Sequence, residues 1–189
     1  MKSIKNIGKT AAGLSVTSDE IIEFHAARLL LLIAMCGNKN KERDGHSIEG
    51  LTKLAKLDFF IRYPSFFNRI AEYLQKDAQI ESEELESKMI RFHYGPWDKR
   101  YYQVLPYLEA RGIIKIEKNN KQYIFLLTKL GEELAKQLKK NKKYGDVVGK
   151  MKVVGQTFRN TSGSRLKDLI YEVFKTEVAN KNIDDIINY

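Results

Sequence analysis

The side chains best suited to nucleophilic or metal chemistry are few and lie far apart in this sequence. The single cysteine, Cys36, ends a run of apolar residues, where a cysteine usually packs as a small hydrophobic side chain. The three histidines, His25, His46 and His93, are 21 and 47 residues apart, which is not the spacing of a zinc site. We therefore expect structural roles for these residues, and neither a bound metal nor a cofactor.

Carboxylates and phosphate-binding loops give no stronger sign of catalysis. Glu83, Glu84 and Glu86 belong to a polar stretch, residues 77–88, and a catalytic acid needs a pocket that shifts its pKa. We interpret this stretch as a solvated surface. The complete glycine-rich loop that precedes Lys-Ser or Lys-Thr in nucleotide hydrolases is absent. The chain is therefore predicted not to be an enzyme.

Positive charge is the strongest chemical feature of the chain. The formal net charge is +9, which favours acidic partners, with nucleic acid first among them. DNA-binding proteins use such cations to contact phosphates and the edges of bases. Here the cations lie on a predicted helix over 98–111, at the tip of the hairpin that follows it, and in a later run of lysines. The candidate contacts with double-stranded DNA are Arg100, Lys118, Lys121, Lys140 and Lys143.

One residue argues against a simple groove-reading helix. Pro106 falls inside the predicted helix 98–111, where proline costs about 3 kcal/mol and kinks the backbone. A kinked helix is a poor probe of a straight major groove, but it can serve as a docking surface for a protein.

The elements that would position these cations are predicted by residues 97–138. Apolar residues at helical spacing end at Gly112, which suits the left-handed end of a helix. Two β-prone runs, 113–117 and 122–127, flank an Asn-rich turn, which is a hairpin signal. Thr128 then caps a further amphipathic helix. Helix, hairpin and helix in this order are typical of a winged helix-turn-helix core.

The rest of the chain predicts further helices around this core. We expect helices over about 19–36, apolar nearly all round, and over 51–63, together with a short strand at 46–48 that joins the hairpin sheet. The predicted fold class is mostly α with a small β-hairpin wing, a winged helix-turn-helix core and a C-terminal helical appendage. The predicted boundaries are a mobile tail over 1–18, a winged-helix-like domain over 19–140, and a basic linker with a helical partner-docking segment over 141–189.

The C-terminal segment carries its own amphipathic stripe. A helix appended to a domain often buries such a face against a partner, although packing onto its own domain is the alternative. The candidate partner contacts are Leu166, Leu169, Ile170, Tyr171 and Phe174.

Composition also bears on the compartment. One cysteine excludes an internal disulfide, and no secretory signal follows the first lysines. The longest apolar run, residues 29–36, is far shorter than the roughly 20 residues of a membrane span. We expect a cytoplasmic protein without a membrane partner.

Three motifs together resemble a known family. They are LTKLAKLDFFIRYPSF at 51–66, FHYGPWDKRYYQVLPYLEARGIIK at 92–115 and TSGSRLKDLIYEVF at 161–174. The chain resembles the middle component of bacterial ABC-three-component antiphage defence systems, of which the Lamassu type is one, over about residues 19–176.

The resemblance implies a small non-enzymatic subunit. Its implied partners are an SMC-like ATPase subunit and an effector subunit, often a nuclease, which the small subunit helps to hold inactive until foreign DNA is sensed. The resemblance brings no catalytic residues with it. A rival hypothesis from another class is a homodimeric winged-helix transcription regulator, in which C-terminal helices dimerise and two recognition helices read a palindrome.

Overall fold

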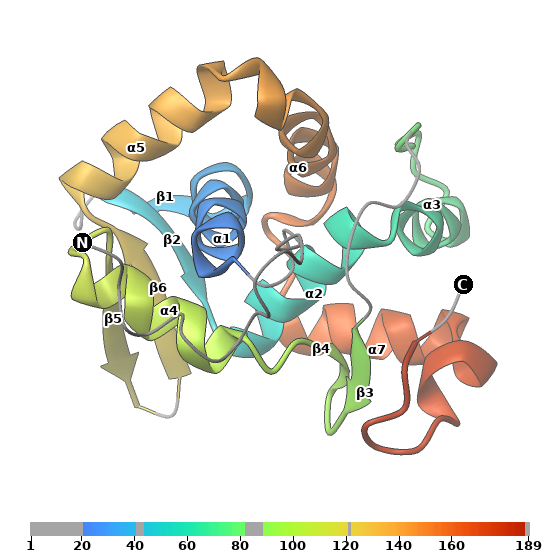
Figure 1. The fold of residues 1–189 in the computed structure, drawn as a ribbon. Coiled ribbons are helices and arrows are strands. Elements are labelled where there is room, and N and C mark those ends of the chain that lie inside the picture. Colours follow the sequence, from blue (N-terminus) through green and yellow to red (C-terminus); the bar gives the residue numbers. More distant parts are fainter. Residues whose placement is uncertain (1–20, 41–43, 82–88, 121, 188–189) are drawn as a thin grey trace, which may run out of the picture.

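The computed structural model describes residues 21–40, 44–81, 89–120 and 122–187 (Figure 1). The predicted tail over 1–18 and the candidate DNA contact Lys121 lie outside the described residues. The fold is mostly α with a small antiparallel sheet, which confirms that part of the predicted class.

The elements alternate between helices and short strands along the chain. In order they are α1 (Ile22–Cys36), β1 (Asn38–Asn40), β2 (Gly45–Glu49), α2 (Leu51–Arg62), α3 (Pro64–Tyr73), β3 (Ile90–Phe92), β4 (Gly95–Trp97), α4 (Tyr101–Ala110), β5 (Ile114–Asn119), β6 (Gln122–Leu127), α5 (Lys129–Lys140), η3 (Lys142–Tyr144), α6 (Gly145–Phe158), α7 (Gly163–Val173) and η4 (Lys175–Ala179).

The larger sheet has four antiparallel strands in the order β1-β2-β6-β5. Phe125 on β6 lies opposite Ile48 on β2 and Ile116 on β5, so the strand predicted at 46–48 does join the hairpin sheet. Asn120 in the turn adopts a φ of 54°, the left-handed conformation that asparagine tolerates.

Two local signals around this hairpin are confirmed in detail. Gly112 follows α4 with a φ of 67°. The Thr128 side chain accepts a hydrogen bond from the Gly131 amide at 3.1 Å and donates one to the Gly112 carbonyl at 2.7 Å. The caps therefore fix where α4 ends and where α5 begins.

Helix α1 lies at the centre of the molecule (Figure 1). Leu29, Leu31, Leu32 and Ile33 are fully buried, as expected for a helix that is apolar nearly all round. Helices α2, α4, α5 and α6 and strand β2 all contact α1, so the core forms around it.

The segment after residue 141 does not form a separate appendage. Helix α6 packs against α1 and α2, and α7 packs against α2 and α3. The Phe158 ring stacks on Phe60 with centroids 5.2 Å apart. At Gly155, an added Cβ would lie 2.7 Å from the Met35 carbonyl oxygen, so α6 and α1 approach very closely. The lysine-rich surface of this segment resembles a linker in sequence, but its apolar face belongs to the common core.

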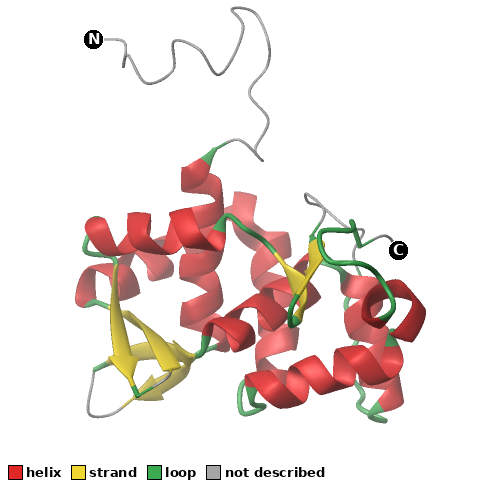
Figure 2. Cartoon of the chain, turned by 90° about the horizontal axis from the view of Figure 1, so that it is seen from below, coloured by secondary structure: helices red, strands yellow, loops and turns green. Residues whose placement is uncertain are grey.

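A second, smaller sheet lies apart from the first (Figure 2). Strands β3 and β4 form an antiparallel hairpin, and residues 184–187 line its outer edge through an Ile90–Ile186 bridge. The Ile187 amide donates to the Met89 carbonyl at 3.0 Å, and the Ile187 side chain is fully buried. Within the described part of the chain, no helix has both the length and the apolar character needed to cross a membrane.

Candidate functional site

A buried ionic cluster joins α1, α2 and the start of α4. Asp58 on α2 is completely buried and accepts hydrogen bonds from Arg28 Nε at 2.8 Å and from the Tyr101 hydroxyl at 2.7 Å. Arg62, one turn along α2, lies 3.5 Å from the same carboxylate. The three partners come from three helices or their flanks, so one carboxylate fixes the positions of all three.

The cluster continues through Asp98, which precedes α4. Its carboxylate accepts a hydrogen bond from Arg62 Nη1 at 2.7 Å and one from Arg100 Nη2 at 2.6 Å. The imidazole of His25 lies between two guanidinium groups, 3.0 Å from Arg28 Nη1 and 2.9 Å from Arg100 Nη1. Two carboxylates thus face three arginines in one connected network.

The electrostatics of this cluster suit a structural role. Burial acts to raise the pKa of Asp98, but hydrogen bonds from Arg100 and the charge of Arg62 outweigh it and hold the pKa well below its usual range. Burial and the charge of Asp58 raise the pKa of Tyr101 well above its usual value. Neither group gains or loses a proton near neutral pH, so neither Asp98 nor Tyr101 is suited to act there as a general acid or base.

Sequence reasoning missed this cluster, although a signal was present. Arg28 interrupts an apolar helix, and Asp58 lies in an aromatic one, LDFFIRY. A charge on the buried face of a helix needs a partner of opposite charge. The partner of Arg28 is 30 residues away, and spacing alone does not reveal it.

The cluster also changes the role of Arg100, a predicted DNA contact. Its guanidinium makes hydrogen bonds to both oxygens of Asp98, and a quarter of its side chain is exposed. Because its donors are engaged inside the protein, we no longer count Arg100 among the cations open to phosphates.

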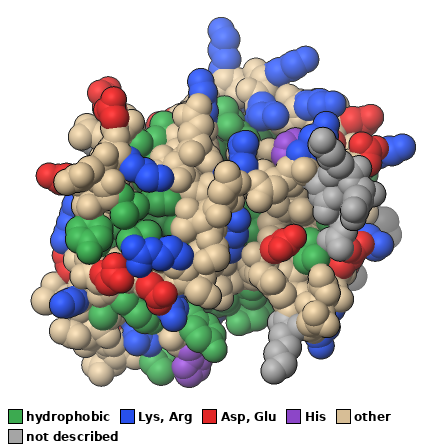
Figure 3. Space-filling model, turned by 180° about the vertical axis from the view of Figure 1, so that it is seen from behind, with side chains coloured by type: hydrophobic (Ala, Val, Ile, Leu, Met, Phe, Trp, Pro, Cys, Tyr) green, Lys and Arg blue, Asp and Glu red, His purple; other side chains and the backbone are tan. Residues whose placement is uncertain are grey.

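The remaining candidate DNA contacts are exposed but do not form one surface. Lys118 lies near the hairpin turn, whereas Lys140 and Lys143 flank the turn from α5 to α6. Figure 1 places these two regions at opposite ends of the molecule. Lysine and arginine side chains gather over α5 and the turn that follows it (Figure 3). Of the candidate contacts, the structure therefore brings together only Lys140 and Lys143.

The predicted partner face on α7 is occupied by the chain itself. Leu166, Leu169, Ile170 and Phe174 are all at least 98% buried. The Phe174 ring lies 4.5 Å from that of Phe66, centroid to centroid. Tyr171 is half-buried, and its hydroxyl donates to the His93 carbonyl at 3.4 Å. The prediction needs correction, because α2 and α3 cover the apolar stripe that the sequence left without a partner.

The exposed face of α4 is free of positive charge. Residues 101–110 include no lysine or arginine, and the one charged residue, Glu109, accepts a hydrogen bond from the Ile116 amide at 2.8 Å. Of the flanking cations, Lys99 pairs with Asp184 at 2.8 Å, and the exposed Arg111 guanidinium lies over the Tyr107 ring. This face therefore carries no cation, and Gln103 is its one side chain of a type that pairs bidentately with a base.

Exposed aromatic side chains lie beside this face. Tyr102 on α4 is 57% exposed, and Tyr94 in the β3–β4 turn is 56% exposed. Trp97 stacks on Phe92 at 5.9 Å and lies 6.2 Å from the Tyr102 ring, centroid to centroid. An exposed tyrosine that packs against a buried aromatic ring, as Tyr102 does against Trp97, is typical of protein-binding surfaces.

Lys56 is a second buried charge that the sequence did not reveal. It is fully buried on α2, donates to the Pro96 carbonyl at 2.8 Å, and lies 5.5 Å from the centre of the Trp97 ring. Burial, with the positive charges of Arg91 and Lys167, lowers the pKa of the Lys56 ammonium to about 7.

We expect Lys56→Met to stabilise the protein at neutral pH, by roughly 1–4 kcal/mol, because it removes a buried charge but keeps the volume. The folded pKa of about 7 lies below the ordinary 10.5, so the unfolded chain binds more protons between these values. Wild-type stability must therefore rise with pH across this window, and the advantage of Lys56→Met must shrink. Urea unfolding at several pH values measures the stability of the wild type and the advantage of Lys56→Met.

Lys152→Met is the control for that experiment, since Lys152 is exposed on α6. It should leave stability and its pH dependence unchanged. An advantage of Lys56→Met that stays constant from pH 7 to pH 10 would show that the ammonium is not the cause.

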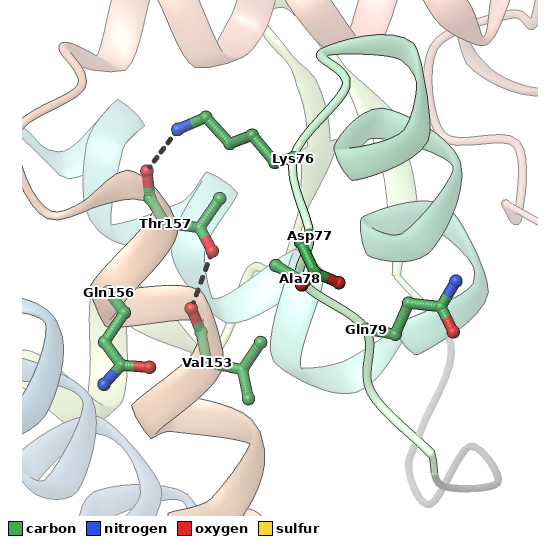
Figure 4. A pocket seen from close by; sticks show the side chains of 7 residues that line it. All are labelled: Lys76, Asp77, Ala78, Gln79, Val153, Gln156 and Thr157. Atoms are coloured by element: carbon green, nitrogen blue, oxygen red, sulfur yellow. Dashed lines mark hydrogen bonds between the residues drawn. The ribbon is translucent and has the colours of Figure 1, made fainter.

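A surface cavity of about 410 Å³ lies where the segment after α3 meets helix α6 (Figure 4). Lys76 Nζ donates to the Thr157 carbonyl at 3.1 Å, and the Thr157 hydroxyl donates to the Val153 carbonyl at 2.9 Å. Figure 4 shows the amides of Gln79 and Gln156 pointing apart. The polar groups are thus engaged with backbone or diverge, and no convergent set faces the cavity.

The residues with nucleophilic or metal chemistry also stay separate. Cys36 is buried as predicted, and burial raises the pKa of its thiol to about 12. His46 pairs with Glu132 at 2.8 Å, whereas His93 is exposed. Among the residues that the structure describes, no group of three or more His, Cys, Asp or Glu side chains could hold a metal ion.

Comparison with known proteins adds no further assignment. No protein-family model, curated protein or solved structure matches this chain.

Proposed function

We propose that this chain is a non-enzymatic, protein-binding accessory subunit built on a winged-helix core. Its complex would contain an SMC-like ATPase and an effector, and would act in the bacterial cytoplasm against foreign DNA. The three sequence motifs support the choice of complex, and the surface of α4 supports binding to protein.

The winged-helix part of this proposal is supported by strand order. Strand β2 precedes α2 and pairs with β6, the second strand of the hairpin, so the order β2-β6-β5 follows. Helix α4 directly precedes that hairpin, which is the place of a recognition helix. Helix α3 and the β3–β4 hairpin would then be an insertion between the two helices of the helix-turn-helix unit.

The observation that carries the proposal is the cation-free face of α4. In a DNA-reading winged helix this face enters the major groove, where arginine, lysine, asparagine and glutamine make the specific contacts. Here it presents Tyr102, Gln103, Pro106 and a glutamate whose carboxylate binds the wing backbone. Such a surface suits a protein partner better than an acidic duplex.

The test is purification of the tagged chain expressed from its own operon, with mass determination of what elutes. We expect a complex with a large coiled-coil ATPase, and we expect Tyr102→Glu to abolish it while the chain stays folded. Tyr73→Glu is the matched control, because Tyr73 is also 57% exposed but lies on α3. Survival of the complex with Tyr102→Glu would remove α4 from the interface.

The second candidate remains the homodimeric transcription regulator, which the exposed Lys118, Lys140 and Lys143 favour. Its dimer interface would have to differ from the C-terminal face that the sequence suggested, because the Leu166 to Phe174 stripe is buried within one chain. A lone dimer that shifts a specific operator fragment would support this candidate over the accessory subunit.

A further inference from the structure

The positive charge of the chain is concentrated in one stretch. Residues 129–152, which run from the start of α5 into α6, hold eight lysines and three acids, and so carry +5 of the formal net charge of +9. Figure 1 places the turn between the two helices at the outer edge of the molecule. The five exposed lysines at the end of α5 and in η3, which we call the α5–η3 lysines, are Lys136, Lys139, Lys140, Lys142 and Lys143.

The acids of this stretch do not pair with the α5–η3 lysines. Glu132 bonds to His46 on β2, although Lys139 lies near it. Asp146 pairs with a buried lysine one turn along α6, and Glu133 is exposed on α5. Among the residues that the structure describes, no salt bridge engages any of the five lysines. Their charge therefore faces solvent and is open to an external anion.

Helix stability explains only part of this arrangement. Lys139 and Lys140 lie in the last turn of α5, where the negative end of the helix dipole favours cations. Lys142 and Lys143 directly precede α6, at the positive end of its dipole, where cations are disfavoured. Lys136 and Lys140 are four residues apart on α5, a spacing at which like charges destabilise a helix. Charges that oppose the fold are expected where a ligand of opposite charge offsets them.

The surface around these lysines suits phosphates better than a protein or a membrane. None of the exposed large hydrophobic side chains of the described chain lies within residues 136–143, whereas a protein interface has an apolar core and a membrane-bound helix inserts apolar residues.

The same surface favours a duplex over a single strand. Single-stranded bases stack on exposed aromatic rings, and the aromatic residue beside the lysines, Tyr144, is half-buried. Residues 136–143 offer few groups for reading bases, because the uncharged polar side chains are those of Gln137 and Asn141, and Asn141 accepts a hydrogen bond from the Lys143 amide.

We propose that the α5–η3 lysines bind the phosphate backbone of double-stranded DNA without reading its sequence. This goes beyond the proposed function, which assigns α4 to a protein partner, because it gives the chain a second surface that holds DNA directly. A duplex carries one charge per roughly 1.7 Å of its axis, so several phosphates lie within reach of the five lysines. Each phosphate that a lysine neutralises releases a counterion, and the binding therefore weakens as salt rises.

Fluorescence anisotropy of a labelled duplex of about 20 base pairs, titrated with the full chain at several salt concentrations, tests this proposal. If all five lysines contribute, the slope of log affinity against log salt should be about −4 to −5, at roughly −0.9 per phosphate. Lys136→Gln with Lys140→Gln, and Lys142→Gln with Lys143→Gln, should each weaken binding about tenfold or more and reduce the slope by about 2. All four sites are exposed, so both double variants should stay folded by circular dichroism.

The matched control removes the same charge from other places on the surface. Lys118→Gln with Lys175→Gln changes two exposed lysines, one on β5 and one on η4. Affinity should fall by less than about threefold, and the salt slope should not change. A loss in this control as large as that in the two α5–η3 variants would make the effect one of net charge, and would overturn the assignment.

Further results would also overturn it. These are absence of duplex binding, a salt slope that both α5–η3 variants leave unchanged, and a preference for one duplex over another of shuffled sequence. Tighter binding to a single strand or to phosphatidylserine vesicles, or displacement of the duplex by polyglutamate of equal charge, would assign the lysines to a different partner.

The operon purification separates this inference from the proposed function. Both α5–η3 variants should co-purify with the ATPase, because α4 is unchanged in them. A complex that forms around a chain without duplex binding removes the DNA contact alone. Duplex binding by a chain that purifies without the ATPase keeps the DNA contact and removes the accessory-subunit assignment.

Discussion

Asp58→Ala is expected to lower the free energy of unfolding by about 3–5 kcal/mol, the cost typical of removing one partner from a buried ion pair. Asp58 is fully buried and accepts a hydrogen bond from Arg28 Nε at 2.8 Å. Its loss removes one acceptor from the buried Arg28 guanidinium and the acceptor of the Tyr101 hydroxyl. Since small domains are stable by about 5–15 kcal/mol, the variant should be partly unfolded or nearly so.

Urea unfolding followed by circular dichroism measures this effect. Asp58→Asn keeps the volume and one acceptor oxygen but removes the charge, so a loss close to that of the alanine variant would identify the ion pairing as the cause. Glu133→Ala, at an exposed site on α5, should change stability by less than about 0.5 kcal/mol. A loss below about 1 kcal/mol in Asp58→Ala would contradict a central role for the cluster.

Phe174→Asp is expected to unfold the isolated chain, with a loss of more than about 4 kcal/mol, because it creates a cavity and buries a charge. The Phe174 ring is fully buried against Phe66, and the Arg69 guanidinium lies 4.6 Å from its centre. If Phe174 were a partner contact, this variant would stay folded and lose only assembly. The two roles therefore give opposite results in one experiment on the chain alone.

Thermal and urea unfolding of the purified chain decide between them. Phe174→Leu, which keeps most of the apolar volume, should cost about 1.5 kcal/mol or less. Glu172→Ala, exposed two residues earlier on α7, serves as a control and should be nearly neutral. A folded Phe174→Asp chain with wild-type stability would return the stripe on α7 to the list of partner surfaces.

The features that were predictable from sequence depend on residues close together in the chain. Gly112 ends α4 and Thr128 caps α5 through contacts within a few residues of each, and Asn120 takes the left-handed conformation that the turn requires. Hydrophobic periodicity also located the central helix, because nearly every face of α1 is buried. Local geometry decides these elements, so local sequence predicts them.

The missed features depend on pairs far apart in the chain. Asp58 meets Arg28 across 30 residues, and Arg62 meets Asp98 across 36. The burial of the α7 stripe depends on α2 and α3, about 100 residues earlier, and an amphipathic pattern is the same whether its apolar face meets its own domain or another protein. Arg100 is different, because its partner Asp98 is only two residues away, and what the sequence did not show is that Asp98 is buried.

The close approach of α6 to α1 has a consequence for the order of events during synthesis. Helices α6 and α7, which cover the central helix and α2, leave the ribosome more than 100 residues after α1. Until then, leucines that are fully buried in the finished protein remain without their cover. Long-range contacts of this kind slow folding and prolong the exposure of apolar surface. The core around α1 therefore cannot be completed until α6 and α7 have been synthesised.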